Sequence, residues 1–172
     1  ESNLSWAEPR IIRTNEPEVV SHYLKKWQEE GKPVAYDLET DAIDPLTARV
    51  RCVGIGTEEE ALVVEIESIF GNPLASPEQQ AALKKIFRTF FQEPGIPILG
   101  HNAGQYDRLV MEQWTGITPN LSCDTILLHL LADNELPHNL GFVGSFYTDN
   151  PEAWKADHTA VEAKTDEELH IY

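Results

Sequence analysis

The sequence has little basic charge, little cysteine and no long apolar run. Its 172 residues contain 13 Lys and Arg against 29 Asp and Glu, which gives a formal net charge of −16. This deficit of basic residues argues against a protein that binds nucleic acid through a broad basic face, but it does not exclude a site that binds nucleic acid through metal ions. No stretch approaches the roughly 20 apolar residues of a membrane span, so no membrane partner is predicted.

The two cysteines and the N-terminal residues indicate the cellular compartment of the protein. Cys52 and Cys123 form no metal-binding spacing, and we interpret both as free thiols in a reducing compartment. The N-terminal residues lack the basic segment and apolar core of a signal peptide. The sequence therefore predicts a cytoplasmic protein. Because the chain opens on Glu1 instead of Met, we expect it to be a fragment of a longer protein.

The composition predicts one globular domain over residues 1–172. Apolar residues make up 41% of the chain, and no internal repeat is present. Periodicity and capping residues predict helices at 16–30, 76–91, 106–114, from about 124, at 138–147 and from 165, and strands at 33–38, 48–57, 61–66 and 96–100. Strands followed by helix–strand alternation predict an α/β fold with a mixed sheet and helices on its faces.

Two acids share one face of an otherwise apolar strand. In Tyr36-Asp-Leu-Glu-Thr-Asp41, Asp37 and Glu39 point to the same side, with Cβ atoms roughly 7 Å apart. Buried together they would repel each other unless a cation lay between them, and Mg²⁺ prefers carboxylate oxygens. The alternative is a strand end at which both acids point to solvent.

A third acid follows the strand at 96–100. In Gly100-His-Asn-Ala-Gly-Gln-Tyr-Asp107, Asp107 stands at the start of a predicted helix. Acids in that position often only complement the helix dipole. Asn102 and Asp107 flank a glycine-containing turn at a strand's carboxyl end, where ligands gather in open α/β sheets. Asp124 is interpreted as an N-cap of the helix that follows it.

These two motifs resemble the first two motifs of the DEDD-type 3′–5′ exonucleases. The nearest resemblance is to the proofreading domain of family A, phage-type DNA polymerases, and residues 135–149 are similar to a stretch those polymerases carry. The family's third motif is a Tyr with an Asp four residues later. Residues 168–172 resemble the run into it, with Tyr172 as its Tyr, so the chain would be truncated inside that motif. A variant pattern of the family with His would use His158.

The resemblance implies a ribonuclease H-like fold with a mainly five-stranded mixed sheet and helices on both faces. It also implies two divalent metal ions, Mg²⁺ or Mn²⁺, that cleave the 3′-terminal phosphodiester of single-stranded DNA. Asp37 would bridge both ions, Glu39 would hold the ion that activates water, and Asp107 would hold the ion beside the leaving oxygen. Tyr172 would orient the attacking water.

The same resemblance suggests substrate contacts and a partner. Thr40 would meet the terminal 3′-OH, Ile43 would wedge against the last base, Asn102 would bond the backbone, and Tyr106 would stack on a base. For Ile43 and Tyr106 the alternative is core packing. A polymerase domain is expected C-terminal to this domain, in the host cytoplasm if a phage encodes it.

Three functions remain open at this point. The first is a proofreading 3′–5′ exodeoxyribonuclease that forms part of a DNA polymerase. The second is an RNA-directed 3′–5′ exoribonuclease of the same superfamily, since the same metals cut both substrates. The third is a catalytically silent module that binds 3′ ends, because the fourth acidic ligand is absent from the printed sequence.

Overall fold

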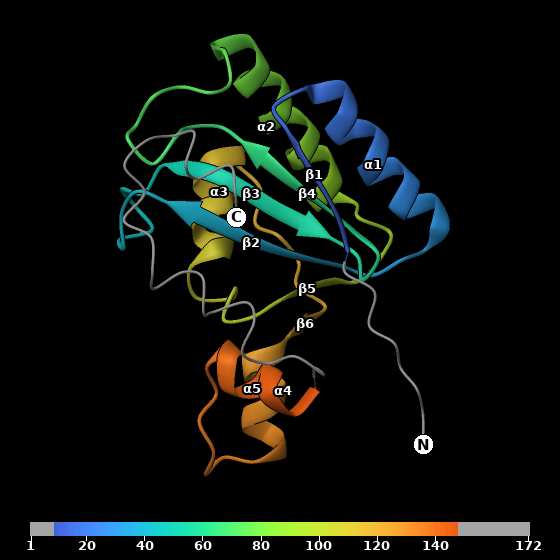
Figure 1. Cartoon of the computed structure of the whole chain (residues 1–172), viewed down its shortest axis with the longest axis vertical. Helices are drawn as coiled ribbons and strands as arrows, with labels where there is room; N and C mark the ends of the chain where they lie inside the picture. The colour runs from blue at the N-terminus through green and yellow to red at the C-terminus, as the bar shows by residue number, and fades with distance from the viewer. Residues whose placement is uncertain (1–8, 148–172) are drawn as a thin grey trace. The chain divides into compact units, whose positions relative to one another are not determined.

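The computed structural model describes residues 9–147 (Figure 1). The strands are β1 (Arg10–Thr14), β2 (Val34–Thr40), β3 (Val50–Gly56), β4 (Glu60–Glu65), β5 (Ile98–Gly100) and β6 (Cys123–Asp124). The helices are α1 (Pro17–Glu30), α2 (Pro77–Gln92), α3 (Asp107–Thr115), α4 (Thr125–Ala132) and α5 (Leu140–Tyr147). Residues 9–125 belong to one compact unit and residues 126–147 to another.

The strands form one mixed sheet in the order β1-β4-β3-β2-β5-β6. The meander of β2, β3 and β4 is antiparallel, whereas β1 joins β4 and β5 joins β2 in parallel. The strand β2 is therefore an inner strand, and the short strand β5 accompanies it only at Val34 and Ala35. Beyond that point the β5 side of β2 is open to other partners.

The helices α1, α2 and α3 pack on one face of this sheet (Figure 1). An aromatic group forms the centre of the core, with Tyr36 of β2 against Phe91 of α2, and Phe87 of α2 against Trp114 of α3. Along β2 buried and exposed residues alternate, and Val34, Tyr36 and Leu38 face this core. Asp37 and Glu39 consequently lie on the opposite, exposed side of the strand.

Helix ends follow their sequence signals. Ser76 caps α2 in a capping box with Gln79, and Pro77 occupies the first turn. Gly31 ends α1 in the left-handed conformation, with a φ of 68°. By contrast, α3 begins after Tyr106 without a side-chain cap. The start of α3 must be held in place by something else.

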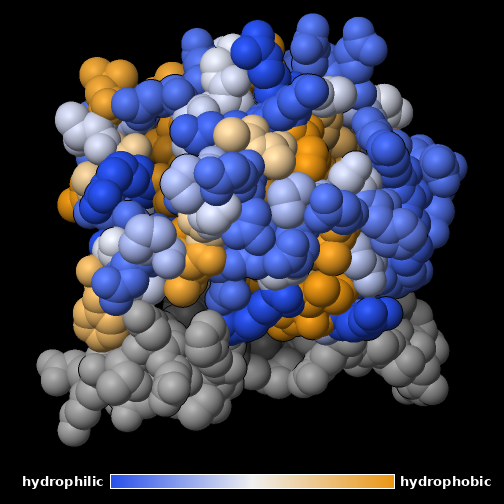
Figure 2. All heavy atoms as spheres, turned by 90° about the horizontal axis from the view of Figure 1, so that it is seen from above, coloured by the Kyte–Doolittle hydropathy of each residue, from blue (hydrophilic) through white to orange (hydrophobic). Residues whose placement is uncertain are grey.

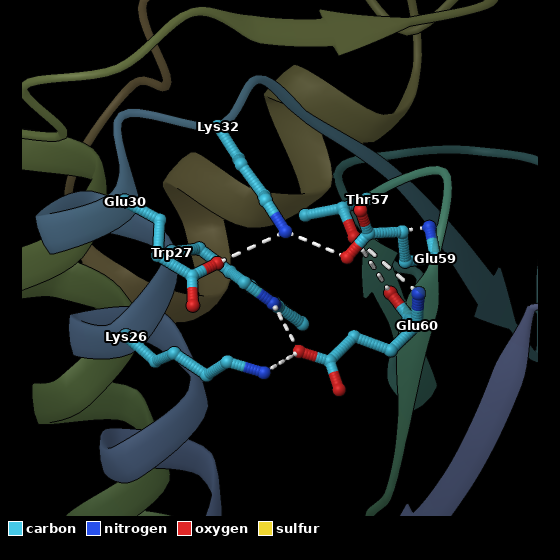
Figure 3. A network of polar contacts seen from close by, with 7 residues as sticks. All are labelled: Lys26, Trp27, Glu30, Lys32, Thr57, Glu59 and Glu60. Carbon is cyan, nitrogen blue, oxygen red and sulfur yellow. Dashed lines mark hydrogen bonds and ion pairs between the residues drawn. The ribbon is translucent and has the colours of Figure 1, made fainter.

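A polar network fastens α1 to the tip of the β3–β4 hairpin (Figure 3). Glu60 is 7% exposed and accepts hydrogen bonds from Lys26 Nζ and, at 3.1 Å, from Trp27 Nε1. Lys32 Nζ lies 2.6 Å from Glu59 and 3.1 Å from Glu30. The ammonium group of Lys26 holds the pKa of Glu60 below its usual range. Glu60 is thus a buried ionised group with defined donors.

The second unit is a helical hairpin formed by α4 and α5. His129 is 7% exposed, and its Nδ1 lies 2.7 Å from Nδ1 of His138. Phe142 and Phe146 of α5 contact the His129 ring.

In the part of the chain that the structure describes, no helix is long and apolar enough to cross a membrane. Figure 2 shows one face of the molecule, on which hydrophilic side chains surround separate hydrophobic patches.

The predicted α/β fold with a mixed sheet is confirmed, and most predicted elements lie within two residues of the observed ones. The sheet has six strands, whereas the resemblance implied mainly five: it contains the four strands predicted from the sequence together with β1 and the two-residue β6, which were not predicted. Glu60, which precedes the predicted strand at 61–66, is buried and begins β4. The helix predicted from residue 165 lies outside the described residues.

Candidate active site

Asp37 and Glu39 project from one face of β2, as predicted, and both are exposed on that face. Next to them the register with β3 shifts: Glu39 pairs with Cys52, and Thr40 pairs with Val50, so Arg51 is the additional residue. Such bulges bend a strand and re-aim its side chains, and they are common beside active sites. The two acids therefore lie where β2 leaves regular pairing.

Asp107 reaches this strand from the first turn of α3. Its Oδ1 accepts a hydrogen bond of 2.9 Å from the backbone N–H of Leu38, between the two acids of β2. On the same edge of β2, the Val34 N–H donates to the Pro97 carbonyl oxygen, next to β5. The Asp107 carboxylate therefore takes the place of a strand acceptor at Leu38, where β5 no longer pairs with β2. A buried N–H that lacks a strand partner needs such an acceptor. Asp107 itself is 6% exposed.

The pKa of Asp107 responds to the charges of the other two acids. Burial, followed by the charge of Asp37, raises the pKa of Asp107 to about 6, and Glu39 adds to the effect. Loss of solvation raises the pKa of Asp37 too, although the residue is on the exposed side of β2, and His101 partly opposes that rise. A repelling, partly desolvated pair of this kind is stabilised by a cation.

Tyr106 and Thr40 form a hydrogen-bonded group with the backbone of Ala42. The Tyr106 hydroxyl lies 2.5 Å from Thr40 Oγ1, and both hydroxyls are within reach of the Ala42 carbonyl oxygen. Since each hydroxyl has one proton, one of them donates to Ala42 and the other donates to its neighbour. Tyr106 is half-buried against the core, so it supports Thr40 and its own ring is partly covered.

The loop 41–49 is closed by an ion pair at its base. Asp41 accepts hydrogen bonds of 2.7 Å from the Arg49 backbone N–H and from Arg49 Nε, and these bonds lower the pKa of Asp41. Ile43 on this loop is 94% exposed. That exposure excludes the core-packing alternative for Ile43, and its predicted contact with a base remains a prediction.

The turn that contains Asn102 is held by Asp124. Asn102 has a φ of 60°, the left-handed conformation that Asn tolerates. Its backbone N–H donates to Asp124 Oδ1 at 2.7 Å, and the N–H of Gly104 donates to Oδ2 at 3.0 Å. The sequence predicted only an N-cap role for Asp124 and missed this contact. The contact follows from the sheet, in which Asp124 pairs with Gly100 just before the turn, and no local sequence signal marked that pairing because β6 was not predicted.

His101 lies on the same turn and forms a second link, to Thr125, the residue that follows β6. Its Nδ1 is 2.8 Å from Thr125 Oγ1, which in turn donates to the Gly100 carbonyl oxygen at 3.2 Å. Gly100 is required here, because an added Cβ would lie 2.4 Å from Cβ of Ala103. The turn therefore folds back closely over the end of β5.

Not every predicted site residue is brought together. Tyr172, the predicted partner of the attacking water, lies outside the described residues, as does His158. Within residues 9–147 no group of three or more His, Cys, Asp or Glu side chains is arranged to hold a metal ion. Asp37 and Asp107 still fit a hard divalent cation in donor type and charge, because Mg²⁺ commonly takes one or two protein carboxylates and completes its shell with water and substrate phosphate.

A sequence model of the family described as 3′–5′ exonuclease matches residues 11–161. The chain belongs to the 3′–5′ exonuclease family. The match spans both motifs and the hydrogen-bonded turn between Gly100 and Asp107. A search among curated proteins finds no significant match.

Solved structures of several nucleases share the fold of this exonuclease domain. NrnC of Brucella melitensis matches with a TM-score of 0.58 and 22% identity, over 83% of this chain and 62% of NrnC. RNase D of Escherichia coli matches with a TM-score of 0.61 and 12% identity, over 94% of this chain and 40% of RNase D. The catalytic core of RRP6 from Trypanosoma brucei gives 0.60 and 17%, over 96% and 43%.

These neighbours confirm the predicted ribonuclease H-like fold. The chain spans 62% or less of the length of these three structures. At these identities the likeness concerns the fold alone.

Proposed function

We propose that this domain removes nucleotides from the 3′ end of single-stranded DNA, as a proofreading exonuclease does. The observation that carries the proposal is the Asp107 carboxylate on the Leu38 N–H, which brings a third acid to the strand that carries Asp37 and Glu39. The sequence resemblance to polymerase proofreading domains supports DNA as the substrate. The match to the 3′–5′ exonuclease family supports the reaction.

Asp37, Glu39 and Asp107 would hold two divalent cations, Mg²⁺ or Mn²⁺. NrnC has been solved with bound Mg²⁺, which supports the choice of ion. When bound, such ions supply an activated water and neutralise charge on the phosphate. The protein's part is to keep three acids deprotonated and in place, and the family's Tyr, here Tyr172, is proposed to orient the water.

The terminal nucleotide is proposed to lie over the β2 end and the loop 41–49. Thr40 would meet the 3′-terminal sugar, with its hydroxyl oriented by Tyr106. Ile43 would contact the last base, since its side chain is almost fully exposed on a closed loop. Asn102 would bond the backbone of the strand from the rigid turn before Asp107.

RNA is the second candidate substrate, and a specific observation favours it. The structural neighbours include RNase D, described as an exoribonuclease involved in structured RNA processing, and NrnC bound to pGG. The same three acids serve either substrate, because the cleaved bond is a phosphodiester in both.

The experiment compares DNA and RNA oligonucleotides of one sequence. Each is labelled at its 5′ end and incubated with the purified chain and Mn²⁺, and the products are resolved by length. We expect a ladder that shortens from the 3′ end, faster on DNA and abolished in Asp37→Ala. Glu58→Ala is the matched control, since Glu58 is an exposed acid of the β3–β4 turn.

The outcomes separate the candidates. Faster shortening of RNA favours the exoribonuclease. Binding of a 3′ end without shortening, by both wild type and Asp37→Ala, favours the silent binding module and overturns the exonuclease proposal for this chain.

The proposal extends to a polymerase partner in the same cytoplasm. The resemblance to family A polymerases supports a polymerase domain on the C-terminal side of this domain. The sequence of the parent gene tests this directly: polymerase motifs downstream of codon 172 support it, and an unrelated downstream domain contradicts it.

A further inference from the structure

We propose that Asp124 is a positioning residue for the reaction, which acts on Asp107 through the turn between Asn102 and Gly104. This inference rests on the proposed function, because it assigns a part to Asp107. Asp124 accepts hydrogen bonds from the backbone of the turn that leads into α3.

The carboxylate of Asp124 forms a clamp on the backbone of Asn102 and Gly104. The N–H groups of Asn102 and Gly104 converge on the two oxygens of one carboxylate, at 2.7 Å and 3.0 Å. Two converging backbone N–H groups form an anion-binding concavity, and hydrogen bonds to a charged acceptor are stronger than neutral ones. The clamp holds Asn102 in the left-handed conformation, at a φ of 60°.

The clamped turn is connected to the start of α3 by a backbone hydrogen bond. The Arg108 N–H donates to the Ala103 carbonyl oxygen at 2.9 Å, so the residue between the two clamped positions also anchors the helix start. The helix lacks a side-chain cap of its own, and uncapped helix ends fray. Asp107 is the first residue of this helix, so its position depends on the turn.

Asp124 is itself held in place by the sheet. Asp124 ends β6, and Gly100 at the end of β5 pairs with it in the sheet. His101 and Thr125 add a second link between the turn and the segment after β6. The sheet therefore fixes Asp124, Asp124 fixes the turn, and the turn delivers Asp107 to Leu38 on β2.

The test uses the full chain with Asp124→Ala and Asp124→Asn, and Glu112→Gln as a matched control. Glu112 is an exposed acid on α3, the helix that carries Asp107. The Asn variant keeps one acceptor oxygen but places an NH₂ group against the other N–H, so it should have the smaller effect. Amide hydrogen exchange is measured by NMR at Asn102, Gly104 and Leu38, with Phe87 of α2 as the internal reference for global stability.

We expect faster exchange in Asp124→Ala at Asn102, at Gly104 and also at Leu38, with Phe87 unchanged. The Mn²⁺ concentration that half-saturates the protein, measured by calorimetry, should rise about 10-fold, as is typical when a residue that supports a metal ligand is lost. The control should match the wild type in both measurements.

Other outcomes overturn the inference. If Asn102 and Gly104 exchange faster while Leu38 and the Mn²⁺ midpoint stay unchanged, Asp124 stabilises only its own turn. If Phe87 also exchanges faster in both Asp124 variants, the role of Asp124 is one of general stability. If the wild type binds no Mn²⁺ at all, the proposed function fails, whereas the Leu38 exchange still decides whether Asp124 positions Asp107.

Discussion

The backbone N–H of Leu38 donates a 2.9 Å hydrogen bond to Oδ1 of Asp107, and this bond joins the middle of β2 to the first turn of α3. It places a buried carboxylate beside Asp37, whose charge contributes to its raised pKa. Burial of this carboxylate and the charge of Asp37, which the Leu38 bond only partly offsets, therefore cost stability when no cation is present. The stability of the metal-free protein should therefore depend on the charge of Asp107.

Asp107→Asn should stabilise the metal-free protein at neutral pH. A pKa of about 6 in the folded state, above the usual value of 3.8, means that the folded chain binds the proton more tightly than the unfolded chain. The wild type should therefore lose stability as the pH rises from about 4 to about 6, by about 2–3 kcal/mol in total. Urea unfolding in EDTA from pH 4.5 to 8 measures this.

In Asp107→Asn that part of the slope should vanish, because the amide still accepts from Leu38 but carries no charge. Glu112→Gln, which removes an exposed acid of the same helix, should keep the wild-type slope. A wild-type slope in Asp107→Asn would contradict the assignment.

Divalent cations should raise the melting temperature of the wild type. A ligand that binds only the folded state at 100 times its Kd adds about 2.7 kcal/mol to the free energy of unfolding. The rise should be reduced in Asp37→Asn and in Asp107→Asn and retained in Glu58→Gln. Thermal unfolding with increasing Mn²⁺ measures it, and equal rises in all four proteins would place the metal elsewhere.

Gly100→Ala should disturb the turn before Asp107. The added Cβ would lie 2.4 Å from Cβ of Ala103, and overpacking of this kind typically costs about 1–3 kcal/mol. Ala103→Gly removes the opposing methyl group, so the double variant should be more stable than the sum of the two single changes predicts. Urea unfolding of the four proteins in the cycle tests the contact, and simple additivity would contradict it.

Changes in the Figure 3 network should follow a fixed order of destabilisation. Glu60→Ala leaves the buried Trp27 Nε1 without its acceptor, at a cost of about 1–3 kcal/mol. Glu60→Gln keeps an acceptor for Trp27 and loses only the ionic bond to Lys26, so it should cost less. Lys26→Met leaves the buried Glu60 carboxylate without its counter-charge, so it should cost more than Glu60→Gln but less than Glu60→Ala, since Trp27 keeps its acceptor. Denaturant midpoints give the order, and a Lys26→Met effect as large as that of Glu60→Ala would contradict it.

Ile43→Ala should leave stability unchanged within about 0.5 kcal/mol, because the side chain is 94% exposed. If Ile43 contacts the last base, the same change should slow removal of the terminal nucleotide several-fold. Leu46→Ala, on the same loop and 73% exposed, is the comparison. Equal rates for both variants and the wild type would remove Ile43 from the site.

Local sequence signals predicted the elements that they themselves determine. The helix α2 has a capping Ser76 and a proline in its first turn, and the strand β2 has an apolar alternation, so both were placed closely. The strand β1 has neither feature. Its Ile11 is 63% exposed, and its pairing depends on β4, far along the chain, so no local pattern predicted it.

In the site, too, the features set by local sequence could be predicted, and those set by strand order could not. Asp37 and Glu39 could be selected because they share one face of an apolar strand, and Asp107 because it follows a glycine-containing turn after a strand. The Asp107–Leu38 bond and the Asp124 clamp could not be, because each depends on which strands are neighbours in the sheet. Residues 69 and 22 positions apart meet only once that strand order is known.

The parallel pairing of β1 with β4 has a consequence for synthesis of the chain. The register matches Arg10 with Glu60, so the first strand leaves the ribosome about 50 residues before its partner exists. At about 5–20 residues per second, this is an interval of roughly 3–10 s. During that time the N-terminal strand is an unpaired segment with two adjacent isoleucines, and translation speed sets how long other chains have access to it.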